Sequence, residues 1–239
     1  MKRALVTGGN SPIGTAICRE LASMGFHIIV HGHQHQEAIH EVMSLLKEAG
    51  GSAETVCCDI TDGAATEQTM NTLLENGPIQ VIVHNAGIFD DAPMAGMTLP
   101  QWHRVIDVSL HGFFHVTQPL LLPMIRTRWG RIIAISSLSG MVGHRGQTNY
   151  SAAKSGLHGA ARSLATEVAS RGITVNVVAP GLIHSPSTGN AFTVEQIESM
   201  VPMKRAGQPE EVASVVGFLA SEKASYLSGQ IIGVNGAMA

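Results

Sequence analysis

Short apolar segments alternate with segments of helical periodicity along the whole chain, and this alternation limits the folds that the chain can adopt. The apolar segments predict strands at residues 4–6, 26–30, 53–58, 79–83, 130–136, 174–179 and 231–234. The helical patterns predict helices at residues 13–24, 37–47, 63–76, 99–128, 150–171 and 209–221. Strands that are apolar throughout are typical of a parallel sheet covered by helices on both faces. We therefore predict an α/β protein: a single doubly wound domain with a seven-stranded, mostly parallel sheet.

Two regions of this pattern are less regular. Pro119 and Pro123 are expected to interrupt the predicted helix at 99–128, or its last turns, because proline removes a helix hydrogen bond. Residues 182–204 are expected to be irregular, with one short helical piece.

The composition excludes several classes of protein. The chain of 239 residues is 44% hydrophobic and shows no repeat or linker, so we expect one domain over residues 1–239. A net charge of −3 offers no basic surface to nucleic acid, and the apolar runs are too short to insert into a membrane. Because a strand is predicted to start at residue 4, we expect no signal peptide. Three cysteines (Cys18, Cys57 and Cys58) make no disulfide framework, so we expect reduced thiols and a cytoplasmic location.

A glycine-rich turn at residues 7–14 joins the first strand to the first helix. Glycines let the backbone approach a pyrophosphate, and the N–H groups of a helix N-terminus attract negative charge. Small residues (Asn85, Ala86 and Gly87) follow the fourth strand, at the sheet edge where ligands bind in such folds. This context favours a dinucleotide site over a simple tight turn. Residues of about 1–130 would form the cofactor half, and residues of about 131–239 the catalytic and substrate half.

The second predicted strand ends without the acidic residue that would bind the ribose 2′-hydroxyl of NAD. An acid would repel a 2′-phosphate, so its absence favours NADP. His33 and its neighbours are candidates to donate to that phosphate, with a solvated polar turn as the alternative. His31, His33 and His35 share a face of an extended segment, but no carboxylate or cysteine joins them, so we predict no metal site.

Tyr150 and Lys154 are four residues apart in a predicted helix, which places both side chains on one face. An unperturbed tyrosine titrates near ~10 and transfers protons poorly at neutral pH. A lysine beside it in a dry cleft stabilises the phenolate and lowers that pKa. Ser137 follows the fifth strand, where its hydroxyl is placed to hold a carbonyl oxygen. This group predicts acid/base chemistry.

The motifs, in this order and spacing, resemble the short-chain dehydrogenases/reductases over the whole chain. The resemblance rests on Thr7-Gly8…Gly14, Asp59, Asn85-Ala86-Gly87, Ser137, Tyr150-x-x-x-Lys154 and Pro180-Gly181. Within that family the chain is most similar to the 3-oxoacyl-(acyl-carrier-protein) reductases, through residues 130–133, 167–181, 205–213 and 229–230. The resemblance implies a Rossmann domain that reduces a 3-oxoacyl thioester on acyl carrier protein with NADPH, in a homotetramer.

The resemblance also implies roles for individual residues. Tyr150 would protonate the substrate oxygen, Lys154 would hold the ribose hydroxyls and lower the pKa of Tyr150, and Ser137 would orient the carbonyl. Arg128 and Arg171 match basic residues that dock the acidic carrier beside the cleft. The candidate cofactor-binding residues, His33 included, are Gly8, Asn10, Ser11, Ile13, Gly14, His33, Asp59, Ile60, Asn85, Ala86, Gly87, Tyr150, Lys154, Pro180, Gly181 and Ile183.

Three positions depart from the family pattern. Pro12 replaces the second glycine of the phosphate loop, where proline is tolerated as a first helical residue. Ser11 replaces a basic residue that often contacts the NADP 2′-phosphate. Ser109 stands where the catalytic tetrad has asparagine, and its hydroxyl is a candidate to hold the water of the proton relay. These departures suggest a specialised paralogue, serving for example a polyene or polyketide chain.

Two other functions stay open at this point. One is an NAD(P)-dependent dehydrogenase of a small alcohol, sugar or steroid, which the substrate-covering segment at 182–204 would decide. Phe192, Met200 and Met203 in that segment suit an acyl chain. The other is a non-catalytic, cofactor-binding scaffold subunit, against which the intact Ser137, Tyr150 and Lys154 argue.

Overall fold

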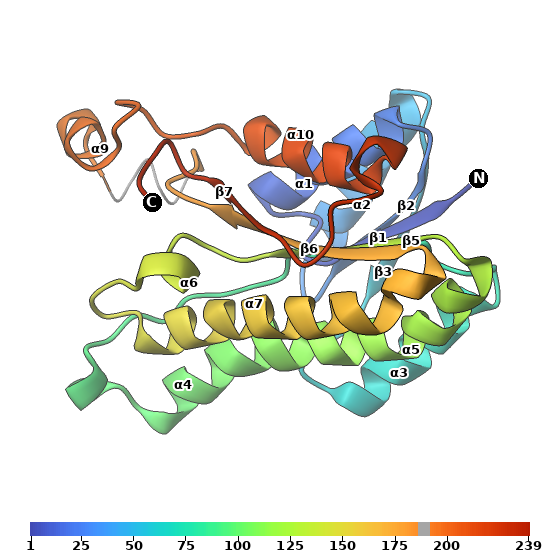
Figure 1. The fold of residues 1–239 in the computed structure, drawn as a ribbon, viewed down its shortest axis with the longest axis horizontal. Coiled ribbons are helices and arrows are strands. Elements are labelled where there is room, and N and C mark those ends of the chain that lie inside the picture. Colours follow the sequence, from blue (N-terminus) through green and yellow to red (C-terminus); the bar gives the residue numbers. More distant parts are fainter. Residues whose placement is uncertain (186–191) are drawn as a thin grey trace.

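A computed structural model describes residues 1–185 and 192–239 of the chain. These residues form one seven-stranded sheet in which every neighbouring pair of strands is parallel (Figure 1). The strands are β1 (Arg3–Val6), β2 (His27–Gly32), β3 (Ser52–Cys57), β4 (Val81–His84), β5 (Gly130–Ile135), β6 (Ile173–Pro180) and β7 (Ile231–Val234). Their spatial order is β3-β2-β1-β4-β5-β6-β7. The structure confirms the predicted α/β doubly wound fold.

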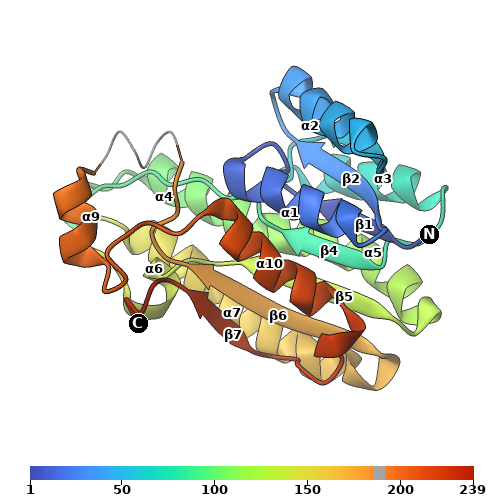
Figure 2. The same cartoon turned by 90° about the horizontal axis from the view of Figure 1, so that it is seen from above.

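Helices cover both faces of the sheet. The α-helices are α1 (Pro12–Ser23), α2 (Gln36–Glu48), α3 (Gly63–Leu74), α4 (Leu99–Ile106), α5 (Gly112–Thr127), α6 (Ser139–Val142), α7 (Thr148–Val168), α9 (Val194–Met200) and α10 (Pro209–Ala220). A π-helical segment, η2 (Asp107–His111), joins α4 to α5, and short 3-10 turns are η1 (Met94–Gly96), η3 (Ala169–Arg171) and η4 (Glu222–Ala224). Figures 1 and 2 show α1, α2 and α10 on one face, and α3, α5 and α7 on the other.

The apolar residues of the strands divide between two cores, one on each face. Val6 and Val30 belong to the core under α1 and α10, whereas Leu5 and Ile29 belong to the core under α5 and α7. Successive strand residues face opposite sides, so a strand covered on both sides is mostly apolar. Thr174 and Asn176 of β6 are buried polar exceptions, and the edge strand β3 carries Ser52 and Glu54 at alternate positions.

The strand order reverses between β1 and β4, where the chain crosses from one half of the sheet to the other. Ligands bind in the crevice outside the carboxyl ends of the strands at such a point. The loops after β1, β4, β5 and β6 therefore surround the expected site.

The helical region at 99–128 differs from the prediction. Pro119 and Pro123 lie inside α5 without ending it, and the interruption occurs instead at η2, around Ser109. The buried face of α5 (Val116, Leu120 and Met124) packs into the core, and this burial offsets the hydrogen bonds that the two prolines remove.

Two other segments are more regular than expected. Strand β2 continues through His31 to Gly32, because both pair with β3, so His31 is a buried strand residue and the solvated-turn interpretation is wrong for it. The loop after Ser137 contains the short helix α6. Within the segment at 182–204, α9 is the expected helical piece, and residues 186–191 lie outside the described residues.

Some properties concern the described part of the chain as a whole. Its helices include none that is long and apolar enough to cross a membrane. The three cysteines are free. Residues 1–185 and 192–239 contain no group of three or more histidine, cysteine or carboxylate side chains arranged to hold a metal ion.

Candidate active site

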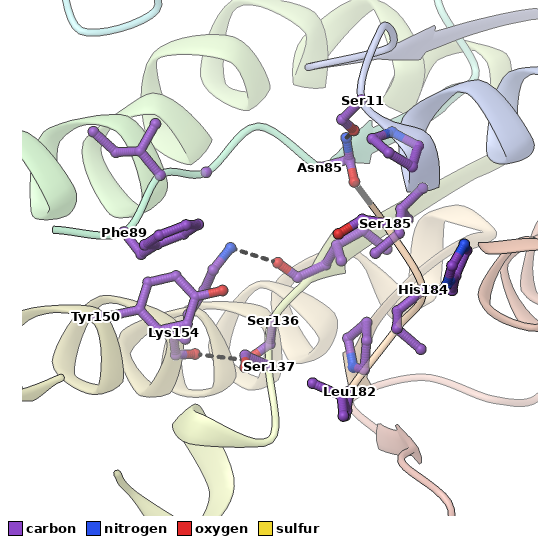
Figure 3. Close-up of a pocket in the computed structure, with 18 residues that line it drawn as sticks. Ser11, Asn85, Phe89, Ser136, Ser137, Tyr150, Lys154, Leu182, His184 and Ser185 are labelled. Atoms are coloured by element: carbon purple, nitrogen blue, oxygen red, sulfur yellow. Dashed lines mark hydrogen bonds between the residues drawn. The ribbon is translucent and has the colours of Figure 1, made fainter. Parts of the chain in front are cut away.

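A cavity of about 340 Å³ lies at the carboxyl ends of the central strands. Figure 3 shows Tyr150 and Lys154 reaching into it from α7, with Ser137 at the end of β5, and Ser11 and Asn85 at the opposite end. Its lining residues are Ser11, Pro12, Ile13, Asn85, Gly87, Ile88, Phe89, Ile135, Ser136, Ser137, Tyr150, Lys154, Pro180, Gly181, Leu182, Ile183, His184 and Ser185.

The Tyr150 hydroxyl interacts with Ser137. Ser137 Oγ accepts the N–H of Ser139 at 3.1 Å, so its own hydrogen is available to the phenol oxygen. Burial raises the pKa of Tyr150, the hydrogen bond with Ser137 lowers it in part, and the charge of Asp91 raises it again; the net shift is upward. The expected lowering of this pKa by Lys154 is not among the causes of the shift, since the Lys154 ammonium donates to the carbonyl of Ile135 and not to the phenol.

Lys154 is buried, with 2% of its surface exposed. Its Nζ donates to the carbonyl of Ile135 at 2.9 Å and lies 5.6 Å from the centre of the Tyr150 ring. Burial lowers the pKa of Lys154 to about 8. A cation held in this way has unused donors, and these are suited to bind hydroxyl groups of a ligand in the cavity.

Ser109 lies directly behind Gly87 and Lys154. Its hydroxyl is buried and has no hydrogen-bond partner within the described residues. A Cβ atom placed on Gly87 would lie 2.9 Å from Lys154 Nζ and 3.5 Å from Ser109 Oγ. The missing side chain of Gly87 thus leaves a small polar space that both groups face.

The loop after β1 is shaped to receive a phosphate group. Ser11 caps α1: its Oγ accepts the N–H of Gly14 at 3.1 Å and donates to the carbonyl of Gly8 at 2.9 Å. Pro12 is the first residue of the helix, as expected. A Cβ on Gly14 would lie 2.2 Å from the Gly8 carbonyl oxygen, so Gly14 supports the loop from behind. Asn85 Nδ2 donates to the Gly8 carbonyl at 2.9 Å and fixes the loop against β4.

A second cavity of about 270 Å³ continues from the first past Ser11 and Gly87. It contains the candidate residues Gly8, Asn10, His33, Asp59, Ile60 and Ala86. His33 Nε2 lies 3.6 Å from Asp59 Oδ2. Burial acts to raise the pKa of Asp59, but hydrogen bonds from Thr61 and the nearby His33 hold it below its ordinary value. Asp59 thus stays ionised, and its carboxylate faces the His33 ring.

Comparison with known proteins identifies the family. The family model described as enoyl-(acyl carrier protein) reductase matches residues 8–238. A 3-oxoacyl-(acyl-carrier-protein) reductase FabG of Aggregatibacter actinomycetemcomitans is 42% identical over 236 residues, which cover 98% of each chain. A protein of the same name from Aquifex aeolicus is 42% identical over 99% of this chain and 97% of its own. A 3-oxoacyl-(acyl-carrier-protein) reductase of Synechocystis is 41% identical over 98% and 96%. The chain belongs to the short-chain dehydrogenase/reductase family.

Membership of this family makes the protein an oxidoreductase with a nicotinamide cofactor. The two cavities share lining residues, and they extend from Asp59 and Ile60 in the second cavity to Tyr150 in the first. Ser11, Gly87 and Ile88 line both cavities. All predicted catalytic and cofactor residues lie around these cavities or, for Gly14 and Ser109, directly behind them.

Arg128 and Arg171 lie far from the Tyr150 cavity in this short-chain dehydrogenase/reductase. Arg128 ends α5, and its guanidinium donates to the carbonyl of Ser170 at 3.3 Å. Both arginines therefore precede β5 and β6, whereas Tyr150 and Ser137 are at the carboxyl ends of these strands. A six-residue strand such as β5 spans about 20 Å. The expectation that these arginines lie beside the cleft is wrong for the cleft of the same chain.

Sequence reasoning missed several lining residues. Ile88 and Phe89 follow the Asn85-Ala86-Gly87 motif, and Phe89 is 67% exposed next to Tyr150 (Figure 3). His184 enters the cavity from the segment after β6. An exposed aromatic residue directly after a ligand-binding motif is a signal that sequence inspection can use.

The buried charge of Lys154 makes a prediction about stability. The pKa of Lys154 is lowered from 10.5 to about 8 in the folded protein. Below pH 8 the buried ammonium therefore destabilises the folded state, and this destabilisation disappears as the pH rises towards 10.5. Relative to wild type, Lys154→Met should therefore gain stability below pH 8 and lose about 3 kcal/mol of that gain by pH 10.5. Urea unfolding at pH 7 and pH 10.5 measures the difference, and an equal offset at both values would contradict the buried charge. Lys47→Met, at an exposed position of α2, is the control.

Proposed function

We propose that the protein reduces a 3-oxoacyl thioester on acyl carrier protein to the 3-hydroxyacyl thioester, with NADPH as reductant. The observation that carries this proposal is the meeting of the Ser137 and Tyr150 hydroxyls beside buried Lys154. Two hydroxyls at one point suit the oxygen of a ketone. The relatives at about 40% identity over full length are named for this reaction.

The residues present fit a nicotinamide dinucleotide. Gly8 and Gly14 allow close packing of the loop after β1, and the N-terminus of α1 offers its N–H groups to a pyrophosphate. Asp59 and Ile60 line the adenosine end of the second cavity. Pro180, Gly181 and Ile183 line the first cavity, where they would flank the nicotinamide. The polar space at Gly87, between Lys154 and Ser109, is placed to hold ribose hydroxyls and a water molecule.

The side chains then divide the proton chemistry. Ser137 donates a hydrogen bond to the ketone oxygen and orients it beside Tyr150. The raised pKa keeps the phenol protonated, as a general acid must be, and the phenol gives its proton to that oxygen as the alcohol forms. NADPH, when bound, supplies the hydride to the carbonyl carbon. Lys154 holds the ribose, and Ser109 can position a water that returns a proton towards Tyr150.

Cofactor choice would depend on His33. The described residues that line the second cavity include no lysine or arginine, and their basic side chains are His31, His33 and His35. His31 is buried and its pKa is lowered to about 4, mainly by burial, so it stays neutral. His33 is half-exposed beside Asp59 and is available to a 2′-phosphate.

His33→Ala is expected to weaken NADPH binding about tenfold and NADH binding less than about twofold, since a hydrogen bond to a charged group is lost for NADPH alone. Fluorescence titrations with NADPH and with NADH measure the two affinities. His40→Ala, on the exposed side of α2, is the control. Equal weakening of both cofactors would remove His33 from this role.

Carrier docking by Arg128 and Arg171 requires a second copy of the chain. Both arginines are exposed at the sheet edge opposite the cavity, so they can serve only the cleft of a neighbouring subunit. The proposed homotetramer would supply that neighbour. The acidic carrier would then contact one subunit while its acyl chain enters another.

The substrate chain would leave the cavity past Phe89. This ring stands exposed beside Tyr150, and exposed Met200 and Met203 follow the segment after β6. An aromatic ring there favours contact with a flat, unsaturated chain. With the departures at Ser11, Pro12 and Ser109, this supports a specialised paralogue that serves a polyene or polyketide.

The test of the function follows the absorbance of NADPH with acetoacetyl thioester on carrier protein and with a free thioester. We expect faster oxidation with the carrier. Arg128→Glu/Arg171→Glu should lose that advantage but keep the rate with the free thioester. The charge-matched control Arg19→Glu/Lys47→Glu should keep both. Oxidation with small ketones and with neither thioester would favour a dehydrogenase of small alcohols, sugars or steroids. Cofactor binding with no turnover on any ketone would favour the scaffold.

A further inference from the structure

His84 ends β4 and is fully buried, yet it lines neither cavity. A buried imidazole destabilises a fold unless both ring nitrogens have partners. The two partners of His84 come from different parts of the site, and they show what this residue holds together.

The hydrogen bonds assign the tautomer of His84. Thr7 Oγ1 accepts the N–H groups of Asn85 and Ala86 at 3.0 and 2.9 Å. Its single hydrogen is therefore left for His84 Nδ1, 3.4 Å away. Nδ1 accepts, so the ring hydrogen is on Nε2, and Nε2 donates to the carbonyl of Ser109 at 2.9 Å.

The ring stays neutral and fixed. Burial lowers the pKa of His84 to about 3, with a further contribution from the charge of Lys154. Phe113 of α5 packs edge-to-face against the ring, with centroids 5.6 Å apart. The bond to Ser109 is thus present throughout the neutral pH range.

The Ser109 carbonyl belongs to η2, the π-helical turn between α4 and α5. There the N–H of Gly112 donates to the carbonyl of Asp107, five residues back. Such turns are rare in proteins, and those that occur often lie at functional sites. This turn directs the Ser109 carbonyl to His84 and its hydroxyl towards the space at Gly87, where Lys154 Nζ also lies.

We infer that His84 is a positioning residue: by tethering the Ser109 carbonyl it holds the π-helical turn in register with Lys154 and so sets the proton path behind Tyr150. This inference rests on the proposed function for its effect on turnover. The tether itself is independent of any reaction.

Two isosteric substitutions separate the two nitrogens of His84. The amide nitrogen of Gln reaches the position of Nε2, so His84→Gln keeps the donor to Ser109. The shorter Asn matches Nδ1, so His84→Asn keeps the contact with Thr7 and loses the tether. We expect His84→Asn to lower kcat about tenfold through misplacement of the relay, with KM for the thioester and Kd for NADPH unchanged. His84→Gln should stay within about twofold of wild type.

Amide hydrogen exchange, measured by mass spectrometry, tests the bond between His84 and Ser109 independently of turnover. Amides of residues 107–112 should exchange faster in His84→Asn than in wild type or His84→Gln. Equal exchange in all three proteins, or equal losses of kcat in both variants, would overturn the inference. A wild type without reductase activity would instead overturn the proposed function, and the exchange data would still decide the tether. If His84→Asn does not fold, the test uses His84→Gln alone. Exchange and kcat equal to those of the wild type support the tether, and faster exchange or a lower kcat in His84→Gln overturns it.

Discussion

Replacing Tyr150 by Phe is expected to lower kcat by about a thousandfold, because the variant has no proton to give to the substrate oxygen. The change removes one oxygen atom from a half-buried ring, so the fold and the cavity should be preserved. Affinity for NADPH should change less than about twofold, since the phenol is placed to act on the substrate. Steady-state kinetics with the carrier thioester and a fluorescence titration of NADPH measure the two quantities.

The chain offers a matched control for this substitution. Its other tyrosine, Tyr226, is fully exposed, so Tyr226→Phe should retain wild-type turnover. If Tyr150→Phe turned over normally, the general acid would be another group and the proposed mechanism would fail. If the variant also supported normal function in cells while wild type reduced no ketone, the scaffold interpretation would replace it.

Gly14→Ala is expected to destabilise the protein by about 3 kcal/mol and to weaken cofactor binding. The added Cβ would lie 2.2 Å from the Gly8 carbonyl oxygen and 2.9 Å from Asn85 Nδ2. Both are backbone or tightly bonded atoms, so the phosphate loop must move to accept the methyl group. Urea unfolding measures the stability, and titration with NADPH measures the affinity.

A glycine-to-alanine substitution at a position with open space separates the effect of this clash from the effect of helix propensity. Gly159 lies in α7 with open space around the position of its missing Cβ. Gly159→Ala should stabilise the protein by up to about 1 kcal/mol, since alanine favours helix over glycine. A Gly14→Ala variant as stable as Gly159→Ala would show that the loop after β1 is not packed as described.

Much of the fold can be predicted from local sequence. A strand covered on both faces is mostly apolar along its whole length, and this pattern is visible without any knowledge of its neighbours. Parallel strands end at one edge of the sheet, so Gly8, Asn85, Ser137 and Pro180 could be placed near one another from their positions after strands. The four-residue spacing of Tyr150 and Lys154 likewise follows from the geometry of a helix.

Other properties depend on contacts between residues far apart in the chain. His31 and His84 read as polar residues at strand ends, and only pairing with β3 and packing under α5 make them buried and neutral. The raised pKa of Tyr150 follows from burial, which its spacing from Lys154 cannot reveal.

The sequence by itself therefore determined the layers of the fold and which residues face the crevice, because these follow from local periodicity and strand ends. The tertiary structure decided the rest. It placed Arg128 and Arg171 at the far edge of the sheet and moved the helix interruption from the prolines to Ser109. Burial and hydrogen-bond pairing set these features, and both depend on what the folded chain brings against each side chain.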